Sequence, residues 1–332
     1  MRKINVGIIG FGVVGQRRKK FIINNRNYNL ITISDVRFNK NFKKKKIFYF
    51  KNYKDVLKLQ NLDAVYVTLP NYLASQVTID FLKKGVHVFC EKPPGRNPSD
   101  IKKVILQEKK NKKVKLKYGF NHRYHESIKL AKKIISKKTY GDVVNIRAIY
   151  GKSKIVTFKK SDWRAKRKFA GGGILLDQGI HLLDLLYYFV GKFEKYKSFI
   201  SNRYWKYDVE DNAFGLMKNS KGVIASIHST ATQWQHKFSM EISLSQATLL
   251  LHGILSGSKS YGKETITIIS KKNKIKKKIF YSKDNSWKQE IDEFAEIILK
   301  NLKVKTGNSE QALDVMNMVY KIYKDDKSWK YN

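Results

Sequence analysis

The sequence predicts an α/β protein: a doubly wound parallel sheet, followed by an α+β domain with a large, mostly antiparallel open sheet. Up to about residue 120, short β-branched apolar runs alternate with helix-length stretches. Such runs are typical of a parallel sheet covered on both faces. Beyond this point apolar and polar residues alternate, which indicates an antiparallel sheet with one exposed or partner-covered face. A chain of 332 residues exceeds one usual compact core, so two domains are expected.

The expected elements follow in order along the chain. Strands are predicted at residues 4–9, 30–34, 64–68, 86–90 and 114–120. A helix near 127–136, a strand at 143–150, a glycine turn at 171–173 and a helix from about 174 to 189 come next. Further strands are predicted at 223–230, 238–244, 247–251, 265–269 and 276–281, and helices at about 287–299 and 309–323. The predicted domains are therefore 1–120 and 121–332, with the last helices able to pack back on the first domain.

The composition of the chain indicates in which cellular compartment the protein works. Met1 leads directly into an apolar strand pattern, without the apolar stretch and cleavage site of a secretory signal, so export is not expected. The apolar stretch 174–190 contains Asp177, His181 and Asp184, which are costly in hydrocarbon, so no membrane partner is expected. The single cysteine, Cys90, cannot form an internal disulfide and is expected to be buried. These features favour a cytoplasmic protein.

The formal net charge of +41 raises the possibility of a nucleic-acid partner. The excess is mostly lysine and is spread over the whole length, whereas nucleic-acid readers favour arginine forks and aromatic platforms. No nucleic-acid partner is therefore expected. The lysine runs at 43–46 and 271–278 are interpreted as solvated turns, with recruitment of an anionic substrate as the alternative.

A glycine fingerprint follows the first predicted strand. It reads Gly10-Phe11-Gly12-Val13-Val14-Gly15 and precedes a helical segment. In such a strand–turn–helix the three glycines permit the tight turn, the approach of a pyrophosphate and the close packing of helix on strand. Asp35 lies 20 residues beyond Gly15 and can accept hydrogen bonds from ribose hydroxyls, which favours NAD. Arg37 could instead cover the 2′-phosphate of NADP, so both cofactors remain open.

Two later motifs complete a resemblance. Cys90-Glu91-Lys92-Pro93 and the segment from Gly173 to Asp184, which contains Asp177-Gln178-Gly179-Ile180-His181, stand in order after the glycine fingerprint. With all three motifs the chain resembles, over essentially its whole length, the glucose-fructose oxidoreductase, inositol dehydrogenase and rhizopine-catabolism (Gfo/Idh/MocA) family. The resemblance implies a Rossmann domain and an open-sheet domain with the cofactor between them. It also implies a sugar, polyol or nucleotide-sugar substrate, and pairing into homodimers or homotetramers through the open sheet face.

The resemblance places Lys92, Asp177 and His181 at the nicotinamide. On an uninterrupted helix Asp177, His181 and Asp184 fall on one face, and three ionisable groups on an apolar helix need water, partners or substrate. Histidine titrates in the range needed to take a hydroxyl proton, so His181 is the expected general acid/base. Lys92 would stabilise developing charge on the same oxygen, and Asp177 would orient substrate or hold His181.

Other positions are assigned with less support from the residues alone. The loop Thr68-Leu69-Pro70-Asn71 and Glu91 are expected beside the cofactor, and Ala74 replaces a histidine that the family often carries. Substrate contacts are expected from the following residues, each with a plain structural role as the alternative: Asn121, Arg123, Trp163, Arg164 and Tyr261. No set of His, Cys and acidic residues has the spacing of metal ligands, so no metal is expected.

The leading hypothesis is an NAD(P)-dependent oxidoreductase that transfers a hydride between the cofactor and a secondary hydroxyl or ketone of a sugar, polyol or nucleotide sugar. One alternative keeps the fold and cofactor but cleaves glycosidic bonds with an internally recycled hydride. Another is a non-catalytic cofactor-binding protein. Net reduction of added NAD distinguishes the first from the second.

Overall fold

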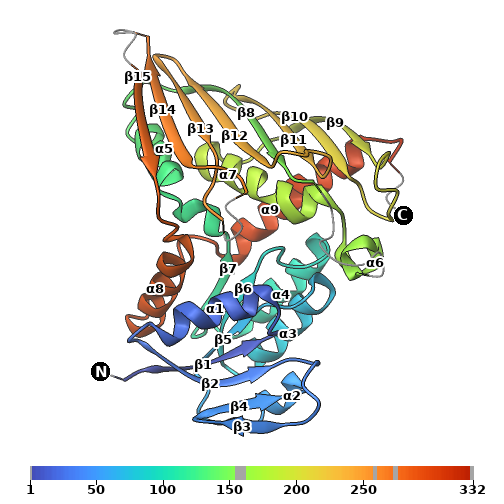
Figure 1. Ribbon diagram of the computed structural model, residues 1–332, viewed down its shortest axis with the longest axis vertical. Helices are drawn as coiled ribbons and strands as arrows, with labels where there is room; N and C mark the ends of the chain where they lie inside the picture. The colour runs from blue at the N-terminus through green and yellow to red at the C-terminus, as the bar shows by residue number, and fades with distance from the viewer. Residues whose placement is uncertain (1, 154–161, 257–259, 272–275, 330–332) are drawn as a thin grey trace. The chain divides into compact units, whose positions relative to one another are not determined.

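The computed structural model describes residues 2–153, 162–256, 260–271 and 276–329 (Figure 1). The chain forms two compact units. Unit 1 comprises Met1–Phe120 and Trp287–Leu313, and unit 2 comprises Asn121–Ser286 and Asp314–Asn332. The first boundary falls directly after Phe120. A C-terminal stretch of the predicted second domain, residues 287–313, belongs to unit 1.

The described strands of unit 1 form a seven-stranded sheet in the order β3-β4-β2-β1-β5-β6-β7. Among them the β3–β4 pair is antiparallel and the other pairs are parallel. The predicted parallel sheet is therefore confirmed, with an added hairpin at one edge. The strands are β1 (Ile4–Ile9), β2 (Tyr28–Ser34), β3 (Phe42–Lys44), β4 (Ile47–Phe50), β5 (Ala64–Val67), β6 (His87–Glu91) and β7 (Leu116–Gly119).

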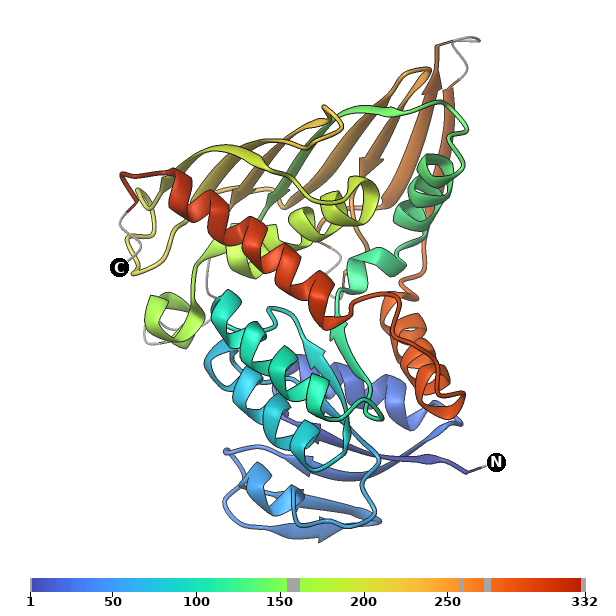
Figure 2. The same ribbon diagram turned by 180° about the vertical axis from the view of Figure 1, so that it is seen from behind.

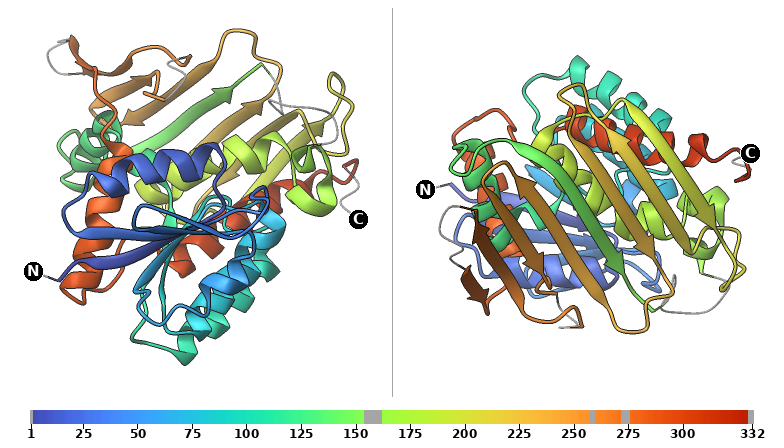
Figure 3. Two further views of the ribbon diagram at one scale, coloured as in Figure 1. Left: turned by 60° about the horizontal axis from the view of Figure 1, so that its bottom comes forward. Right: turned by 90° about the horizontal axis from the view of Figure 1, so that it is seen from above.

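Helices cover both faces of this sheet. Figures 2 and 3 show α3 and α4 side by side on one face and α1 with α8 on the other. Tyr66 of β5 packs edge-on against Phe294 of α8, and both are completely buried. Burial of each such side chain stabilises the fold by about 1.5–3 kcal/mol. The helices are α1 (Val13–Ile23), α2 (Tyr53–Val56), α3 (Asn71–Lys83), α4 (Pro98–Lys110) and α8 (Ser286–Leu299).

The described strands of unit 2 form an eight-stranded sheet in the order β15-β14-β13-β12-β8-β11-β10-β9. Within this sheet the β8–β11 pair is parallel and the other described pairs are antiparallel, which confirms the prediction of a mostly antiparallel sheet. The strands are β8 (Val143–Gly151), β9 (Lys195–Ser201), β10 (Asn212–Lys218), β11 (Ile224–Thr230), β12 (Lys237–Leu244), β13 (Ala247–His252), β14 (Glu264–Ser270) and β15 (Lys276–Tyr281).

One face of the unit 2 sheet carries the helices. Figure 3 shows the strands with the helices of this unit behind them, and along β10 buried and exposed side chains alternate. This alternation arises because successive side chains on a strand point to opposite faces. The opposite, open face is exposed in a single chain. The remaining elements are η1 (Asn121–Tyr124), α5 (Glu126–Ser136), η2 (Trp163–Ala165), α6 (Arg167–Ala170), η3 (Leu175–Gly179), α7 (Ile180–Val190) and α9 (Ser309–Asp325).

The helix predicted from residue 174 is not one continuous α-helix. Its first turn, η3, is a π-helix, and the α-helix α7 begins at Ile180. Close packing accompanies the irregular turn: the Ser229 hydroxyl donates a 3.0 Å hydrogen bond to the Ile174 carbonyl and would lie 2.8 Å from a Cβ on Gly179. Such turns insert one residue into the helix and are frequent at functional sites. The single face predicted for Asp177, His181 and Asp184 assumed one regular helix; His181 and Asp184 both lie on α7, whereas Asp177 lies in the π turn before it.

One helical segment, Arg167–Val190, is long and apolar enough to cross a membrane by length and composition. Its most apolar window is 72% buried inside the structure, which is the environment of a core helix. The lysine run at 43–46 spans the end of β3 and the turn to β4, where Lys45 has a φ of 55°, and all four side chains are exposed. Part of the run at 271–278 lies outside the described residues.

Candidate active site

The glycine turn of unit 1 has the geometry that a dinucleotide requires. Gly10 has a φ of +91°, and a Cβ on Gly15 would lie 2.2 Å from the Gly10 carbonyl oxygen. Gly15 therefore allows α1 to pack directly against the end of β1. A Cβ on Gly12 would meet nothing within 4 Å, so the backbone at the start of α1 is open for a ligand. Helix N-termini with accessible N–H groups bind phosphate groups.

The turn lies where the strand order of the sheet reverses. β2 stands on one side of β1 and β5 on the other, so the loops after β1 and β5 diverge at this point. The Thr68 hydroxyl donates a hydrogen bond to the Gly10 carbonyl and joins the two loops. Pro70 then caps α3, whose first residue, Asn71, is buried. Open parallel sheets bind ligands at such a switch point.

Asp35, at the end of β2, reaches back to the glycine turn. Its carboxylate accepts hydrogen bonds from the Phe11 N–H at 2.6 Å and from the Arg37 Nε at 2.7 Å. Burial alone would raise the pKa of Asp35, but the hydrogen bonds from Arg37 and Phe11 outweigh it and hold the pKa below its ordinary value. The two residues proposed to choose between NAD and NADP are thus directly paired.

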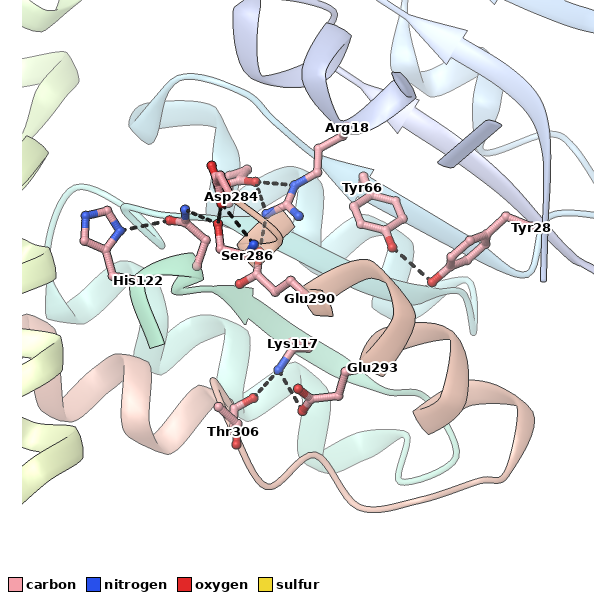
Figure 4. A network of polar contacts seen from close by, with 12 residues as sticks. Arg18, Tyr28, Tyr66, Lys117, His122, Asp284, Ser286, Glu290, Glu293 and Thr306 are labelled. Carbon is pink, nitrogen blue, oxygen red and sulfur yellow. Dashed lines mark hydrogen bonds and ion pairs between the residues drawn. The ribbon is translucent and has the colours of Figure 1, made fainter. Parts of the chain in front are cut away.

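Lys92 follows β6 at the carboxyl edge of the same sheet and is partly buried. The neighbouring Glu91 accepts a 2.7 Å hydrogen bond from the Nε of Arg18. The Arg18 guanidinium also pairs with Glu290 of α8 at 2.5 Å (Figure 4) and lies 4.4 Å from the centre of the Trp287 ring. Glu91, predicted to contact the cofactor, is therefore engaged within the protein.

Buried charges fasten α8 to the sheet of unit 1. Arg18 and Glu290 are fully buried, and burial raises the pKa of Glu290 to about 7, with Arg18 opposing the shift and Glu91 adding to it. Lys117 of β7, also buried, donates to Glu293 of α8 at 3.2 Å (Figure 4). Removing one partner from a buried ion pair costs about 3–5 kcal/mol, so these contacts hold the element that carries Lys92.

In unit 2 the triple-glycine turn positions Asp177. Glu210 is fully buried, and its carboxylate accepts hydrogen bonds from the Gly173 N–H at 2.7 Å and the Leu175 N–H at 2.9 Å. The Tyr323 hydroxyl donates to the same carboxylate at 2.7 Å. A Cβ on Gly172 would lie 2.2 Å from the Tyr323 hydroxyl, and one on Gly173 would lie 2.1 Å from the Glu210 carbonyl oxygen. Glycine is therefore required at both positions.

Asp177 and His181 acquire partners that lie far away in the sequence. The Lys152 Nζ, just after β8, lies 2.7 Å from the Asp177 carboxylate. His181 is buried, and its ring stacks on that of His122 with centroids 3.6 Å apart and planes 15° from parallel. The Tyr150 ring lies 6.1 Å from the His181 ring.

Two tyrosines complete this cluster. The Tyr150 hydroxyl is 3.1 Å from the Nε2 of His122, and the rings of Tyr150 and Tyr261 meet edge-on at 5.2 Å. Burial raises the pKa of Tyr261 well above its ordinary value, and the negative charge of Asp177 adds to the shift. Both tyrosines are therefore neutral hydrogen-bonding groups at physiological pH. Tyr261, Asp177, His181 and Asn121, all predicted site residues, lie within this cluster or bond directly to it.

Arg123 and Asp184 form a buried bidentate ion pair. The Arg123 guanidinium donates to Asp184 from Nε at 2.9 Å and from a terminal nitrogen at 2.6 Å. In this structure the pair connects η1 to α7 within the protein, and the substrate contact expected of Arg123 stays a prediction. The predicted pair Trp163 and Arg164 stack on each other at 4.3 Å, and Arg164 also lies 3.6 Å from Asp162.

Several residues of the cluster were not predicted from the sequence. His122 stands between two predicted residues, Asn121 and Arg123, and this adjacency was an available signal. Tyr150 and Lys152 carried no motif, because only the pairing of β8 with β11 and β12 brings them to α7. In the described part of the chain no group of three or more His, Cys, Asp or Glu residues could hold a metal ion.

The fold and the glycine turn define a dinucleotide-binding protein with a second, open-sheet domain. Residues 4–120 match the model described as an oxidoreductase family with an NAD-binding Rossmann fold, and residues 128–250 match the GFO/IDH/MocA C-terminal domain. The chain belongs to the Gfo/Idh/MocA family of oxidoreductases. The resemblance seen in the sequence motifs is thereby confirmed.

Curated relatives include sugar and polyol dehydrogenases. The chain is 28% identical over 191 residues to glucose-6-phosphate 3-dehydrogenase of Bacillus subtilis, covering 57% of this chain and 53% of that protein. It is 32% identical over 193 residues to myo-inositol 2-dehydrogenase of Thermotoga maritima, covering 57% of this chain and 55% of the relative. The chain spans about half the length of the curated relatives it matches.

Solved structures extend the likeness in fold to the whole chain. Levoglucosan dehydrogenase in complex with NADH superposes with a TM-score of 0.84 at 17% identity, covering 99% of this chain and 98% of the other. Aldose-aldose oxidoreductase from Caulobacter crescentus gives a TM-score of 0.83 at 20% identity, covering 99% of both chains.

Proposed function

We propose that this protein transfers a hydride between a nicotinamide cofactor and a secondary hydroxyl or ketone of a sugar, polyol or nucleotide sugar. The buried His181, with its stacked histidine and neighbouring Asp177–Lys152 pair, supports the proposal most strongly. The glycine turn of unit 1 and the activities named for the relatives support it as well.

The residues at the switch point of unit 1 fit a dinucleotide. The open space above Gly12 would admit a pyrophosphate against the start of α1, and Asp35 stands where ribose hydroxyls would be bound. NAD is the proposed cofactor and NADP the alternative, because Arg37 is also within reach of this position. When bound, the nicotinamide accepts or supplies the hydride.

Three side chains are proposed to act on the substrate oxygen. His181 takes the hydroxyl proton during oxidation and returns it during reduction. Lys92 stabilises the negative charge that develops on the same oxygen. Asp177, whose charge is partly balanced by Lys152, accepts a hydrogen bond from a neighbouring substrate hydroxyl and so orients the ring.

The first experiment is an absorbance assay of nicotinamide reduction. NAD and NADP are each offered with a panel of free sugars, inositols and nucleotide sugars. We expect reduced cofactor with one substrate group, and a loss of at least about 100-fold in kcat for His181→Ala, since a positioned acid/base contributes about 10²–10⁴. His87→Gln, at the start of β6, is the matched control and should keep full activity.

If no compound in the panel reduces the cofactor while NAD is still bound to the purified protein, the result would contradict net oxidation of the substrate. That result would favour the glycosidic cleavage with an internally recycled hydride. If no compound reduces the cofactor and the protein binds neither NAD nor NADP, the proposal as a whole would be contradicted.

We also propose that a second copy of the chain covers the open face of the unit 2 sheet, and that the protein works in the cytoplasm. One row of paired residues across this face carries Phe199, Phe214, Ile149 and Phe280. Phe199 is 77% exposed and Phe280 is 59% exposed in the single chain. Exposed apolar rows of this kind mark interaction surfaces. The cytoplasmic proposal is supported by the one cysteine, whose thiol is buried.

A further inference from the structure

His122 is held by a directional chain of hydrogen bonds. The Ser286 hydroxyl donates to the Asp284 carboxylate at 2.6 Å, and the Asn121 amide nitrogen donates to the Ser286 oxygen at 3.4 Å. The Asn121 carbonyl oxygen is then left to accept from the Nδ1 of His122 at 3.2 Å (Figure 4). Because a carboxylate only accepts hydrogen bonds, each step has one polarity. The chain places a proton on the Nδ1 of His122.

The direction of these hydrogen bonds also fixes the protonation state of the other ring nitrogen of His122, Nε2. With Nδ1 protonated, a neutral His122 has a bare Nε2 that accepts from the Tyr150 hydroxyl at 3.1 Å, and the hydrogen bond between Tyr150 and Tyr261 is then donated by the Tyr261 hydroxyl. Both nitrogens of the neutral ring are then satisfied in a buried site. A second proton would turn Nε2 into a donor and place two imidazolium charges 3.6 Å apart whenever His181 is protonated.

We propose that His122 is a positioning residue for His181: its neutral ring, with Nδ1 protonated toward Asn121 and Nε2 accepting from Tyr150, stacks on His181 and stabilises the charge that His181 acquires with a proton. A cation over a neutral aromatic face is stabilised electrostatically, the more so where water is excluded. The inference rests on the proposed acid/base function of His181. It adds a residue that sets how readily that base is protonated.

Two ion pairs lie beside His181 in sequence or on the elements packed against α7. Arg123 of η1 pairs with Asp184, and Lys152 pairs with Asp177 on the preceding turn. The remaining titratable groups on packed elements are His125 at the N-cap of α5 with Glu264 of β14, Lys132 of α5 beside Tyr188, and Tyr150 with Tyr261.

Two substitutions separate the stack from the hydrogen bonds. His122→Asn keeps a donor and an acceptor but has no ring, whereas His122→Phe keeps an aromatic face but has no hydrogen bonds. The imidazole nitrogens are followed by NMR against pH in nitrogen-labelled protein without substrate. His181 is assigned by the loss of its signal in His181→Ala, among seven histidines in the chain.

In His122→Asn the titration midpoint of His181 should fall by about half to one pH unit, and in His122→Phe it should stay within about 0.3 unit of wild type. The acidic limb of kcat should move with it. Both variants lose the buried imidazole of His122 and should have a lower thermal midpoint. A purely structural role of His122 would therefore change the titration midpoint of His181 equally in both. Equal midpoints in the two variants, or a rise in His122→Asn, would overturn the proposal.

The wild-type protein supplies a test that needs no variant to fold. At neutral pH its spectrum should show His122 with a proton on Nδ1 and none on Nε2. A proton on Nε2 would overturn the inference. These titrations need no substrate. The absence of hydride transfer in the absorbance assay would therefore contradict the proposed function, while the titration of His181 could still be interpreted.

Discussion

Gly12 and Gly15 lie three residues apart, but a methyl group would meet very different surroundings at each. At Gly15 it would collide with the Gly10 carbonyl oxygen at 2.2 Å, and at Gly12 it would enter open space. Gly15 thus permits the close packing of α1 on β1, and Gly12 leaves space for a ligand at the start of α1. A glycine fingerprint in a sequence does not by itself separate these two requirements.

This pair predicts that Gly15→Ala destabilises the fold by about 1–3 kcal/mol, because backbone must move to admit the methyl group. Gly12→Ala should keep the thermal midpoint within a few degrees of wild type and weaken NAD binding by at least about tenfold, since the methyl group intrudes on the pyrophosphate. Calorimetric melting and NAD titration measure both effects. Equal stability of the two variants would contradict the assignment.

The contact between Asp35 and Arg37 predicts a change in cofactor preference. Asp35→Ala removes the acceptor for the ribose hydroxyls and should raise the Kd for NAD by about tenfold or more, in line with 1.4 kcal/mol per tenfold. Arg37→Ala should spare NAD and weaken NADP. Binding of each cofactor to each variant is measured by fluorescence titration. An equal loss for both cofactors in Asp35→Ala would show that Asp35 only supports the loop.

At the scale of elements, polar groups within each unit hold irregular segments in place. Glu210 anchors the triple-glycine turn before α7, and Arg18 joins α1 to β6 and α8. Neither arrangement follows from helix or strand periodicity. Both place a site residue, Asp177 in one case and Lys92 in the other, beside rigid structure.

The attachment of α8 predicts a particular pH dependence of stability. The pKa of Glu290 lies at about 7 in the folded protein, against an ordinary 4.5. Between these values the folded state binds more protons than the unfolded state, so the free energy of unfolding falls as pH rises, by up to about 1.4 kcal/mol per pH unit. Glu290→Gln should flatten this slope between pH 4.5 and 7.

Urea unfolding at several pH values measures the slope. Glu296→Gln is the matched control, because Glu296 lies on the same helix but its side chain is 52% exposed, and its slope should equal that of wild type. A wild-type stability that does not fall across this pH window would contradict the assignment.

At the scale of the whole molecule, the open face of the unit 2 sheet predicts self-association. Phe214, on β10 next to the edge strand β9, is 48% exposed and stacks on His228 at 3.8 Å. Phe214→Lys should place a charge in the proposed interface and convert an oligomer into monomers, as measured by sedimentation. Phe48→Lys, on β4 of the other sheet and 40% exposed, is the control that should leave the assembly intact. A monomeric wild-type protein would rule out the interface.

The sequence predicted the two sheets, the glycine turn and the family motifs because these depend on short-range properties. Strand runs, side-chain alternation and the backbone freedom of glycine are all properties of neighbouring residues. It missed β9 and β10 and the short hairpin β3–β4, whose apolar content is low or mixed with lysine. It also treated the start of α7 as regular helix, because no local pattern distinguishes a π turn.

The sequence by itself therefore determined the fold class, the dinucleotide fingerprint and the candidates Lys92, Asp177 and His181. Only the tertiary structure decided which partners these residues have. His122 and His181 are brought into contact across 59 positions of the chain, and Arg18 and Glu290 across 272. Such contacts depend on the order of strands and the packing of helices, and the charge and protonation of a buried group depend on those contacts more than on its neighbours in sequence.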